Sequence, residues 1–285
     1  MKNCLAIDIG GSKIEICRFN DKCEIISSKK LNTKKFSIGS VEFLEEIKTL
    51  IRENLDDSIC KIGISFNCVV KKGVVLYSSL LGGEINFDIE GEFLKEFNLP
   101  VKLMNDVNAM ALAESVFGKG SNVESFVLLN LGTGIRPSFV TNNVIIEGCR
   151  GNFGEISQRE LLIPEFDGLI KNDDLISGKG ISNIYKKISK KDKDAYEIFE
   201  LCRQDDRDAL GALTIFRKYL ASFLQDISYF YNPERIILNG SLKKASDLFL
   251  PQVINTYREN TLEIFHFKDM VISDIDHSAC LGVIQ

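Results

Sequence analysis

Short apolar runs in the first half of the chain predict strands, and one longer amphipathic stretch predicts a helix. The helical pattern lies near residues 41–54. The predicted strands are residues 4–9, 14–19, 23–28, 60–66 and 101–104. Strands that alternate with helices in this way are typical of an α/β fold.

The second half repeats this theme around an all-helical insert. Its predicted strands are residues near 126–130, 136–141, 144–146 and 235–238. The clearest helix of the insert carries apolar residues at steps of mostly three and four, which marks one wide apolar face. These residues are Leu210, Leu213, Phe216, Leu220, Phe223, Leu224, Ile227 and Phe230. We interpret the face as core, with a dimer contact as a further use.

The size of the chain allows two domains. With 285 residues and 45% hydrophobic content, it can form one large or two ordinary domains with substantial cores. We predict two domains on either side of one cleft.

Two glycine turns each follow a predicted strand and are suited to hold phosphate. Glycine has no Cβ, so backbone N–H groups can approach polyphosphate oxygens, and neighbouring hydroxyls and a lysine add donors. The residues that we predict to face phosphate are Gly10, Gly11, Ser12, Lys13, Gly132, Thr133 and Gly134. Asp8, at the end of the first strand, is suited to hold a hydrated magnesium ion. The alternative is that both segments are ordinary hairpin turns.

Two carboxylates are candidates for contact with a second substrate. Asp106 lies where the strand at 101–104 runs into a helix, so it can accept a hydroxyl proton at the carboxyl edge of the sheet. A simple helix cap is the alternative for Asp106. Glu155 ends a glycine-rich loop and can accept hydrogen bonds from sugar hydroxyls, or it is only solvated.

Together these segments resemble the ROK family of sugar kinases and sugar-responsive repressors over nearly the whole chain. DIGGSK and LGTGI resemble the family's two phosphate motifs, NDVNAMALAES its catalytic segment and GNFGEI the front of its sugar-binding signature. The segment Asn232–Ser241 is similar to the strand and turn that contact adenosine. The resemblance implies the actin-like, ribonuclease-H-like two-domain fold with a nucleotide and sugar cleft between the domains.

The resemblance also implies roles and boundaries. Asp106 would be the general base, Asn105 and Glu155 would bind the sugar, Gly240 would contact the nucleotide, and Asp8 would hold Mg²⁺ through water. The first domain would span residues 1–118, with a C-terminal helix at about 275–285 packing back on it. The larger second domain, with the helical insert, would span residues 119–274.

The chain departs from the family pattern at its zinc module. The family ends its sugar-binding signature with Gly-His and continues with CxCGxxGC, whereas this chain has Ser157-Gln158 and no such cysteines. Zinc needs closely grouped thiolates or imidazoles. Because Cys149 and Cys202 stand singly and His266 and His277 are remote, we predict that the structural zinc is absent.

The predicted sugar rim also departs from the family. Gln158 takes the place of the family histidine, and Asp173 that of a glutamate one methylene longer, so Asp173 binds sugar through a shifted loop or water, or is a solvated turn residue. Asn67 and Gly82 lie in segments that replace the family's rim motifs. Arg136 follows the second glycine turn. Its side chain either contacts phosphate, or blocks phosphate from the turn, or points to solvent.

Charge and cysteine content restrict the class of protein. The chain has a net charge of −5, whereas nucleic-acid binding needs a basic surface that neutralises phosphates. We therefore expect no nucleic-acid partner. The eight cysteines form no CxxC pair and mostly lie in apolar runs, as small core residues do. No leader or membrane-spanning stretch is evident, so we expect a cytoplasmic enzyme with reduced thiols.

These features lead to an expected activity. We expect ATP- and Mg²⁺-dependent phosphorylation of the 6-hydroxyl of N-acetylmannosamine, giving N-acetylmannosamine 6-phosphate in the breakdown of amino sugars and sialic acid. A short chain without the zinc module and with a divergent rim resembles N-acetylmannosamine kinases more than glucokinases. The alternatives are a glucokinase or another hexose or N-acetylhexosamine kinase, and a non-catalytic sugar sensor. DNA-binding members carry a further domain before the first phosphate motif, and here Asp8 lies near the start. The resemblance implies a homodimer.

Overall fold

The computed structural model describes residues 2–40, 42–166 and 168–285, and these residues form two compact units. Unit 1 comprises Met1–Ser121, Asn143–Phe153 and Asp274–Gln285, and unit 2 comprises Asn122–Asn142 and Gly154–Ser273. The domain boundary expected at residue 118 stays a prediction. Among the described residues, no helix combines the length and the apolar character needed to cross a bilayer.

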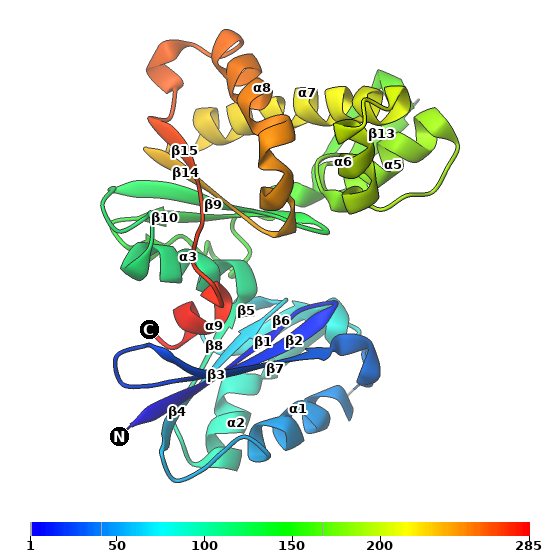
Figure 1. Cartoon of the computed structure of the whole chain (residues 1–285). Coiled ribbons are helices and arrows are strands. Elements are labelled where there is room, and N and C mark those ends of the chain that lie inside the picture. The colour runs from blue at the N-terminus through cyan, green and yellow to red at the C-terminus, as the bar shows by residue number, and fades with distance from the viewer. Residues whose placement is uncertain (1, 41, 167) are drawn as a thin grey trace. The chain divides into compact units, whose positions relative to one another are not determined.

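Unit 1 is built on a mixed sheet with helices on both faces (Figure 1). The strands of this sheet are β1 (Asn3–Ile9), β2 (Lys13–Phe19), β3 (Ile25–Asn32), β4 (Ile59–Phe66) and β8 (Val101–Asn105). Their order is β3-β2-β1-β4-β8, antiparallel among β1, β2 and β3 and parallel from β1 through β4 to β8. A smaller antiparallel sheet consists of β5 (Val69–Lys71), β6 (Val74–Ser78) and β7 (Gly83–Asp88).

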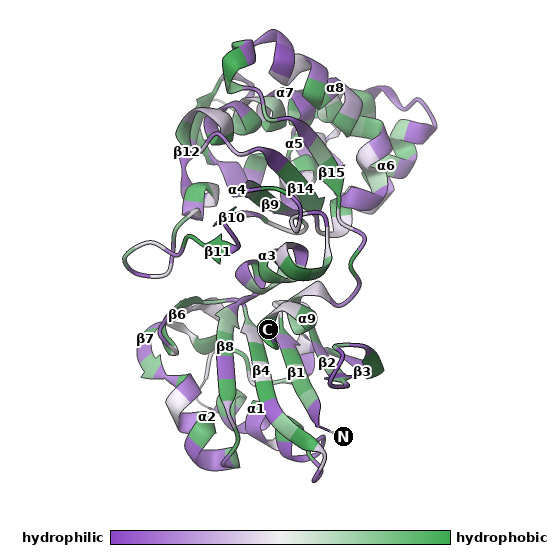
Figure 2. Ribbon diagram, turned by 90° about the vertical axis from the view of Figure 1, so that its left-hand side faces the viewer, coloured by the Kyte–Doolittle hydropathy of each residue, from purple (hydrophilic) through white to green (hydrophobic). Residues whose placement is uncertain are grey.

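The period-two pattern of β1 directs its side chains into two cores. Leu5, Ile7 and Ile9 pack with α1 (Glu42–Arg52) and α2 (Ile89–Phe97). Cys4 and Ala6 pack on the other face with α3 (Asp106–Phe117) and α9 (Ser278–Val283). Figure 2 shows the largely hydrophobic character of β1 and β4 between these layers. Burial on both faces explains why β1 reads as a continuous apolar run.

Unit 2 contains a second sheet with the same strand directions. Its strands include β9 (Ser125–Leu131), β10 (Ile135–Thr141), β14 (Arg235–Asn239) and β15 (Asp269–Ile272). β10 is antiparallel to β9, while β14 is parallel to both β9 and β15. In both units an antiparallel pair that ends in a glycine turn therefore continues into parallel strands, as the repeated pattern predicted.

The helical insert covers one face of the second sheet (Figure 1). Its helices are α4 (Asn172–Leu175), α5 (Gly178–Ser189), α6 (Ala195–Arg203), α7 (Arg207–Phe230) and α8 (Ser246–Glu259). The face predicted on α7 is buried from Leu213 to Ile227, whereas Phe230 at its end is 82% exposed. The remaining short elements are β11 (Val144–Ile145), β12 (Glu160–Ile163), β13 (Gly168–Lys171), and the 3₁₀ turns η1 (Thr33–Lys35), η2 (Ser79–Leu81), η3 (Glu155–Gln158), η4 (Pro164–Phe166), η5 (Ser241–Ala245) and η6 (Glu263–Phe265).

Two predicted elements shift their boundaries. The strand expected at 23–28 begins only at Ile25, because Asn20 accepts hydrogen bonds from the backbone of Lys22 and Glu24 and Cys23 has a φ of 62°. The helix expected near 41–54 is α1, whose described part begins at Glu42, and residue 41 lies outside the described residues.

Candidate functional site

Asp106 is the first residue of α3 and is buried, with 9% of its surface exposed. Asn67, just after β4, donates its side-chain amide to Asp106 Oδ2 at 3.3 Å. Asp106 Oδ1 is buried, and within the described part of the chain it has no hydrogen-bond partner. One carboxylate oxygen is therefore held in place while the other can accept a hydrogen bond from a ligand.

The cap of α3 is Asn105, not Asp106. Asn105 Oδ1 accepts from the backbone N–H groups of Val107 at 2.9 Å and Asn108 at 3.1 Å, and its amide donates to the Cys68 carbonyl. The alternative of a simple cap for Asp106 is therefore wrong, since the preceding residue satisfies the free N–H groups of the helix. Sugar binding by Asn105 stays a prediction.

Asp8 lies at the end of β1, beside Ser65 of β4, which donates a 2.7 Å hydrogen bond to Asp8 Oδ1. Burial and the nearby Asp106 carboxylate raise the pKa of Asp8 to about 7, although Ser65 and Lys13 act in the opposite direction. The second carboxylate near Asp8 favours a positive charge at this place, while burial disfavours a lone carboxylate without a partner. Oxygen donors of this kind suit a hard divalent cation such as Mg²⁺.

The first glycine turn joins β1 to β2. It is closed by the Gly10 amide, which donates to the Lys13 carbonyl at 3.0 Å, and it is braced by Thr33, whose hydroxyl donates to the Gly10 carbonyl at 2.8 Å. Gly11, Ser12 and Lys13 are exposed. A Cβ on Gly11 would meet no atom within 4 Å, so the fold does not require a glycine there. The bare backbone is instead open to a ligand.

The second glycine turn joins β9 to β10 and is braced by the insert. The Gly178 and Lys179 amides, at the start of α5, donate to the carbonyls of Gly132 at 2.8 Å and Thr133 at 3.1 Å. Asp173 Oδ1 accepts from the Ile135 amide at 2.8 Å, and a Cβ on Gly134 would lie 2.6 Å from that oxygen.

Asp173 therefore stabilises the second turn by accepting the hydrogen bond from its backbone. Burial raises its pKa above the ordinary value, although the hydrogen bond from the Ile135 amide opposes this shift. No local pattern along the chain predicts this contact, because Asp173 and the turn are about 40 residues apart. Its expected sugar contact stays a prediction.

Gly240 follows β14, where the predicted adenosine turn begins. Its φ of 89° lies in the region that favours glycine, and a Cβ would overlap the backbone of Leu131 in the neighbouring strand. The glycine is therefore required by the close approach of two strand ends.

The side chains of unit 2 that are predicted to bind sugar form hydrogen bonds with other side chains of the chain. Glu155, at the start of η3, accepts a 3.0 Å hydrogen bond from Arg136 Nε. Arg136, which departs from the family's phosphate motif, therefore contacts the residue predicted to bind the sugar. Gln158 is exposed and accepts from Lys171 at 3.0 Å. In unit 1, Gly82 is exposed after η2, with a φ of 86°.

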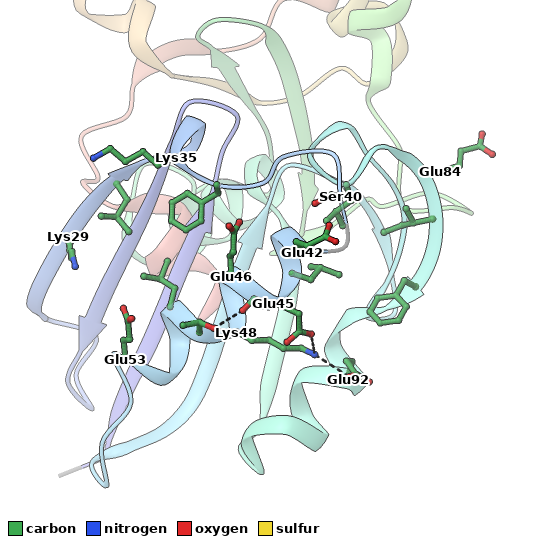
Figure 3. A pocket seen from close by; sticks show the side chains of 18 residues that line it. Lys29, Lys35, Ser40, Glu42, Glu45, Glu46, Lys48, Glu53, Glu84 and Glu92 are labelled. Carbon is green, nitrogen blue, oxygen red and sulfur yellow. Dashed lines mark hydrogen bonds and ion pairs between the residues drawn. The ribbon is translucent and has the colours of Figure 1, made fainter.

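An open pocket of about 1310 Å³ lies elsewhere on unit 1, over α1, β3 and β7 (Figure 3). Apolar side chains such as Leu44 and Phe87 line it together with charged ones, among which Lys48 contacts Glu45 and Glu92. Among the described residues, those predicted to bind sugar or nucleotide do not line this pocket. Pocket size alone therefore does not mark the predicted site.

Comparison with known proteins identifies the family of the chain and several related enzymes. A sequence model described as the ROK family matches residues 4–285. The chain is 24% identical over 259 residues to an N-acetylmannosamine kinase of Haemophilus influenzae strain PittGG, covering 88% of this chain and 84% of the relative. It is 27% identical over 289 residues to an N-acetyl-D-glucosamine kinase of Histophilus somni, covering 94% and 93%.

A solved structure supports the fold. The chain is similar, with a TM-score of 0.81, to a ROK family glucokinase from Streptomyces griseus in complex with glucose and AMPPNP, at 19% identity and with 99% of this chain and 97% of that chain covered. The predicted actin-like, ribonuclease-H-like α/β fold is confirmed.

Proposed function

The chain belongs to the ROK family, and from that premise we propose that it is a sugar kinase that transfers the γ-phosphoryl group of ATP to the 6-hydroxyl of N-acetylmannosamine. The product is N-acetylmannosamine 6-phosphate, an intermediate in the breakdown of amino sugars and sialic acid, and we place the reaction in the cytoplasm.

The observation that carries this proposal is the state of Asp106. Its Oδ2 is held by Asn67, and its Oδ1 is buried without a partner among the described residues. A hydroxyl group that donates to Oδ1 would satisfy that oxygen and orient its own oxygen for in-line attack. Because the transition state of phosphoryl transfer is loose, the proton can move late to the carboxylate.

The two glycine turns support the nucleotide side of the proposal. Gly11 and Gly132 leave backbone open to a ligand, since a Cβ on Gly11 would meet nothing within 4 Å and one on Gly132 would meet only Ser241, at an ordinary 3.7 Å. Lys13, exposed beside the first turn, adds a cation. Asp8 would hold Mg²⁺ through water, and the ion would neutralise charge on the phosphate oxygens.

The choice of sugar rests on the relatives and on the rim. The Haemophilus influenzae relative is an N-acetylmannosamine kinase, while the others are named for N-acetylglucosamine and glucose. Glu155, oriented by Arg136, would accept hydrogen bonds from the sugar. N-acetylglucosamine and glucose are the competing substrates.

The first test is ADP release with Mg²⁺ and ATP in the presence of N-acetylmannosamine, N-acetylglucosamine, mannose or glucose. We expect the highest kcat/KM on N-acetylmannosamine, and at least a hundredfold lower kcat in Asp106→Asn, because general-base catalysis contributes about 10²–10⁴-fold. Asp57→Asn, which changes an exposed carboxylate of the same unit, is the matched control and should keep full activity.

Each other outcome has a defined meaning. A preference for another sugar would retain the kinase and overturn the substrate. Full activity in Asp106→Asn would overturn the assigned base. ATP and sugar binding without ADP release would favour the non-catalytic sensor.

A further inference from the structure

Strand β2 and the start of α9 bring four potential metal ligands together in unit 1. Glu15 and Cys17 are two residues apart on the same face of β2, and His277 and Cys280 are three residues apart at the start of α9. Ligand pairs at such short spacing are typical of zinc sites, where each element supplies two ligands. The pairs are about 260 residues apart in sequence, so only the fold unites them.

The ligand atoms are already close. One ligand atom each of Glu15, Cys17 and His277 lies within 4.8 Å of the other two. His277 Nδ1 is 2.8 Å from Glu15 Oε1. The Cys280 thiol hydrogen-bonds with Cys17 and also lies 3.7 Å from the Glu15 carbonyl oxygen.

These distances can be compared with those of a tetrahedral zinc site. Bonds of about 2.3 Å to sulfur and about 2.0–2.1 Å to nitrogen or oxygen place ligand atoms about 3.3–3.8 Å apart. For Glu15, Cys17 and His277, shifts of about 1 Å, within the reach of side-chain rotations, would therefore give the spacing of a coordination shell. Cys280, in contact with Cys17, would complete it as the fourth ligand.

The environment suits a cation. Cys17 and Cys280 are fully buried, Glu15 is 5% exposed, and Asp8 stands opposite Glu15 in the β1–β2 ladder. Glu15 Oε1 lies 3.2 Å from Lys30 Nζ and 2.8 Å from His277 Nδ1, so its carboxylate already faces a cation in this cluster.

One existing contact has to give way. Lys30 Nζ lies 3.2 Å from the Glu15 oxygen that would bind the metal, and the Lys30 side chain is 59% exposed. It can swing into solvent when a divalent ion replaces its charge. The His277 side chain is 22% exposed, so the cluster has a route to the surface.

We propose that Glu15, Cys17, His277 and Cys280 form a zinc site that ties the C-terminal helix to the second strand of unit 1. Thiolate with imidazole ligands selects Zn²⁺ over Mg²⁺ or Ca²⁺. This site is distinct from the family's zinc module, which would follow Gln158 in unit 2. It departs from our expectation of a zinc-free protein, which treated the cysteines as core residues and His277 as remote.

The test is metal binding by the whole chain, purified with a thiol-free reductant. We expect one equivalent of Zn²⁺ per chain by elemental analysis, and after chelation one equivalent rebound with an affinity measured by competition with a chromophoric chelator. Co²⁺ alone should give the visible bands of a tetrahedral site and a near-ultraviolet thiolate-to-cobalt band. None of these readouts depends on kinase activity.

Variants locate the site. Cys17→Ser and His277→Gln should each weaken Zn²⁺ binding at least tenfold, since even partners of the ligands contribute about 10–100-fold in affinity. Cys202→Ser, which changes a buried cysteine of unit 2, is the matched control and should bind like the parent. His277 is near the surface, so its variant stays informative if Cys17→Ser does not fold.

Two results of the Zn²⁺-binding measurements would overturn the proposal. One is a folded, reduced chain that binds no Zn²⁺ at micromolar concentrations. The other is Zn²⁺ binding that both variants retain, which would place the metal elsewhere. A Co²⁺ spectrum without the thiolate band would likewise exclude Cys17 and Cys280 as ligands.

Discussion

At the residue scale, the glycines predicted to face the nucleotide serve different purposes. Gly134 makes room for Asp173, and Gly240 makes room for the backbone of Leu131, so both are required by the fold. Gly11 meets no neighbour at all. The residue pattern alone predicts the same role for all three glycines. Only the neighbouring atoms show which glycine is needed for packing and which leaves the backbone accessible to a ligand.

Gly11→Ala tests that separation. We expect the free energy of unfolding to change by less than about 0.5 kcal/mol, as for an exposed site, while KM for ATP rises because the methyl group occupies the space of a phosphate oxygen. Chemical denaturation and initial-rate kinetics measure the two effects. Gly134→Ala is the contrasting variant and should lose about 1–3 kcal/mol through its clash with Asp173. Unchanged KM for ATP in Gly11→Ala would exclude the turn as a phosphate contact.

Glu155 offers a second test at this scale. In Glu155→Gln we expect KM for the sugar to rise about 10–100-fold, since hydrogen bonds to a charged group are worth about 1.5–3 kcal/mol. KM for ATP should stay within about twofold. If Glu155 only partners Arg136, the variant will instead lose stability while the sugar KM is unchanged, which kinetics and denaturation distinguish.

At the element scale, the packing of α9 on α3 depends on one glycine. A Cβ on Gly282 would overlap the Ala109 carbonyl oxygen, so the two helices approach at backbone distance. Because α3 also begins with Asp106, this packing helps to fix the segment that carries the proposed base. Gly63 of β4 allows the same approach, since its Cβ would lie 2.7 Å from Val283.

Gly282→Ala should therefore be strongly destabilising. We expect a loss of more than about 3 kcal/mol in the free energy of unfolding or a failure to fold, because backbone has to move to remove the overlap. Gly211→Ala, within α7, is the matched control. Its Cβ would meet Ile188 at an ordinary 3.6 Å, so we expect a gain of about 0.5–1 kcal/mol from helix propensity. Equal effects of the two substitutions would contradict this account of the packing.

At the scale of the whole molecule, ligands of both units should stabilise the chain. We expect an ATP analogue with Mg²⁺ and the sugar each to raise the Tm, with about 2.7 kcal/mol gained at one hundred times the Kd. Asp106→Asn should retain the shift with the ATP analogue, because the proposed role of Asp106 is on the sugar hydroxyl. Differential scanning calorimetry measures this, and a Tm that neither ligand changes would contradict binding at the predicted residues.

The strand pattern, the glycine turns and the strand-to-helix junction at Asp106 could be read from the sequence, because each depends on local periodicity and on residue types a few positions apart. The three short strands β5 to β7 were not predicted, because strands of a few residues in a small separate sheet show no clear alternation of apolar and polar residues. The alternative of a helix cap at Asp106 was one residue too late, because Asn and Asp are both favoured at that position and Asn105 takes it.

By itself the sequence determined the α/β class, the family and the candidate nucleotide and sugar residues, because these depend on short motifs in a fixed order. Only the tertiary structure decided which side chains meet. It placed Asn67 on Asp106, Arg136 on Glu155 and Asp173 behind the second turn, and it brought His277 to Cys17. Contacts between distant segments depend on strand register and helix packing, which no local pattern along the chain records.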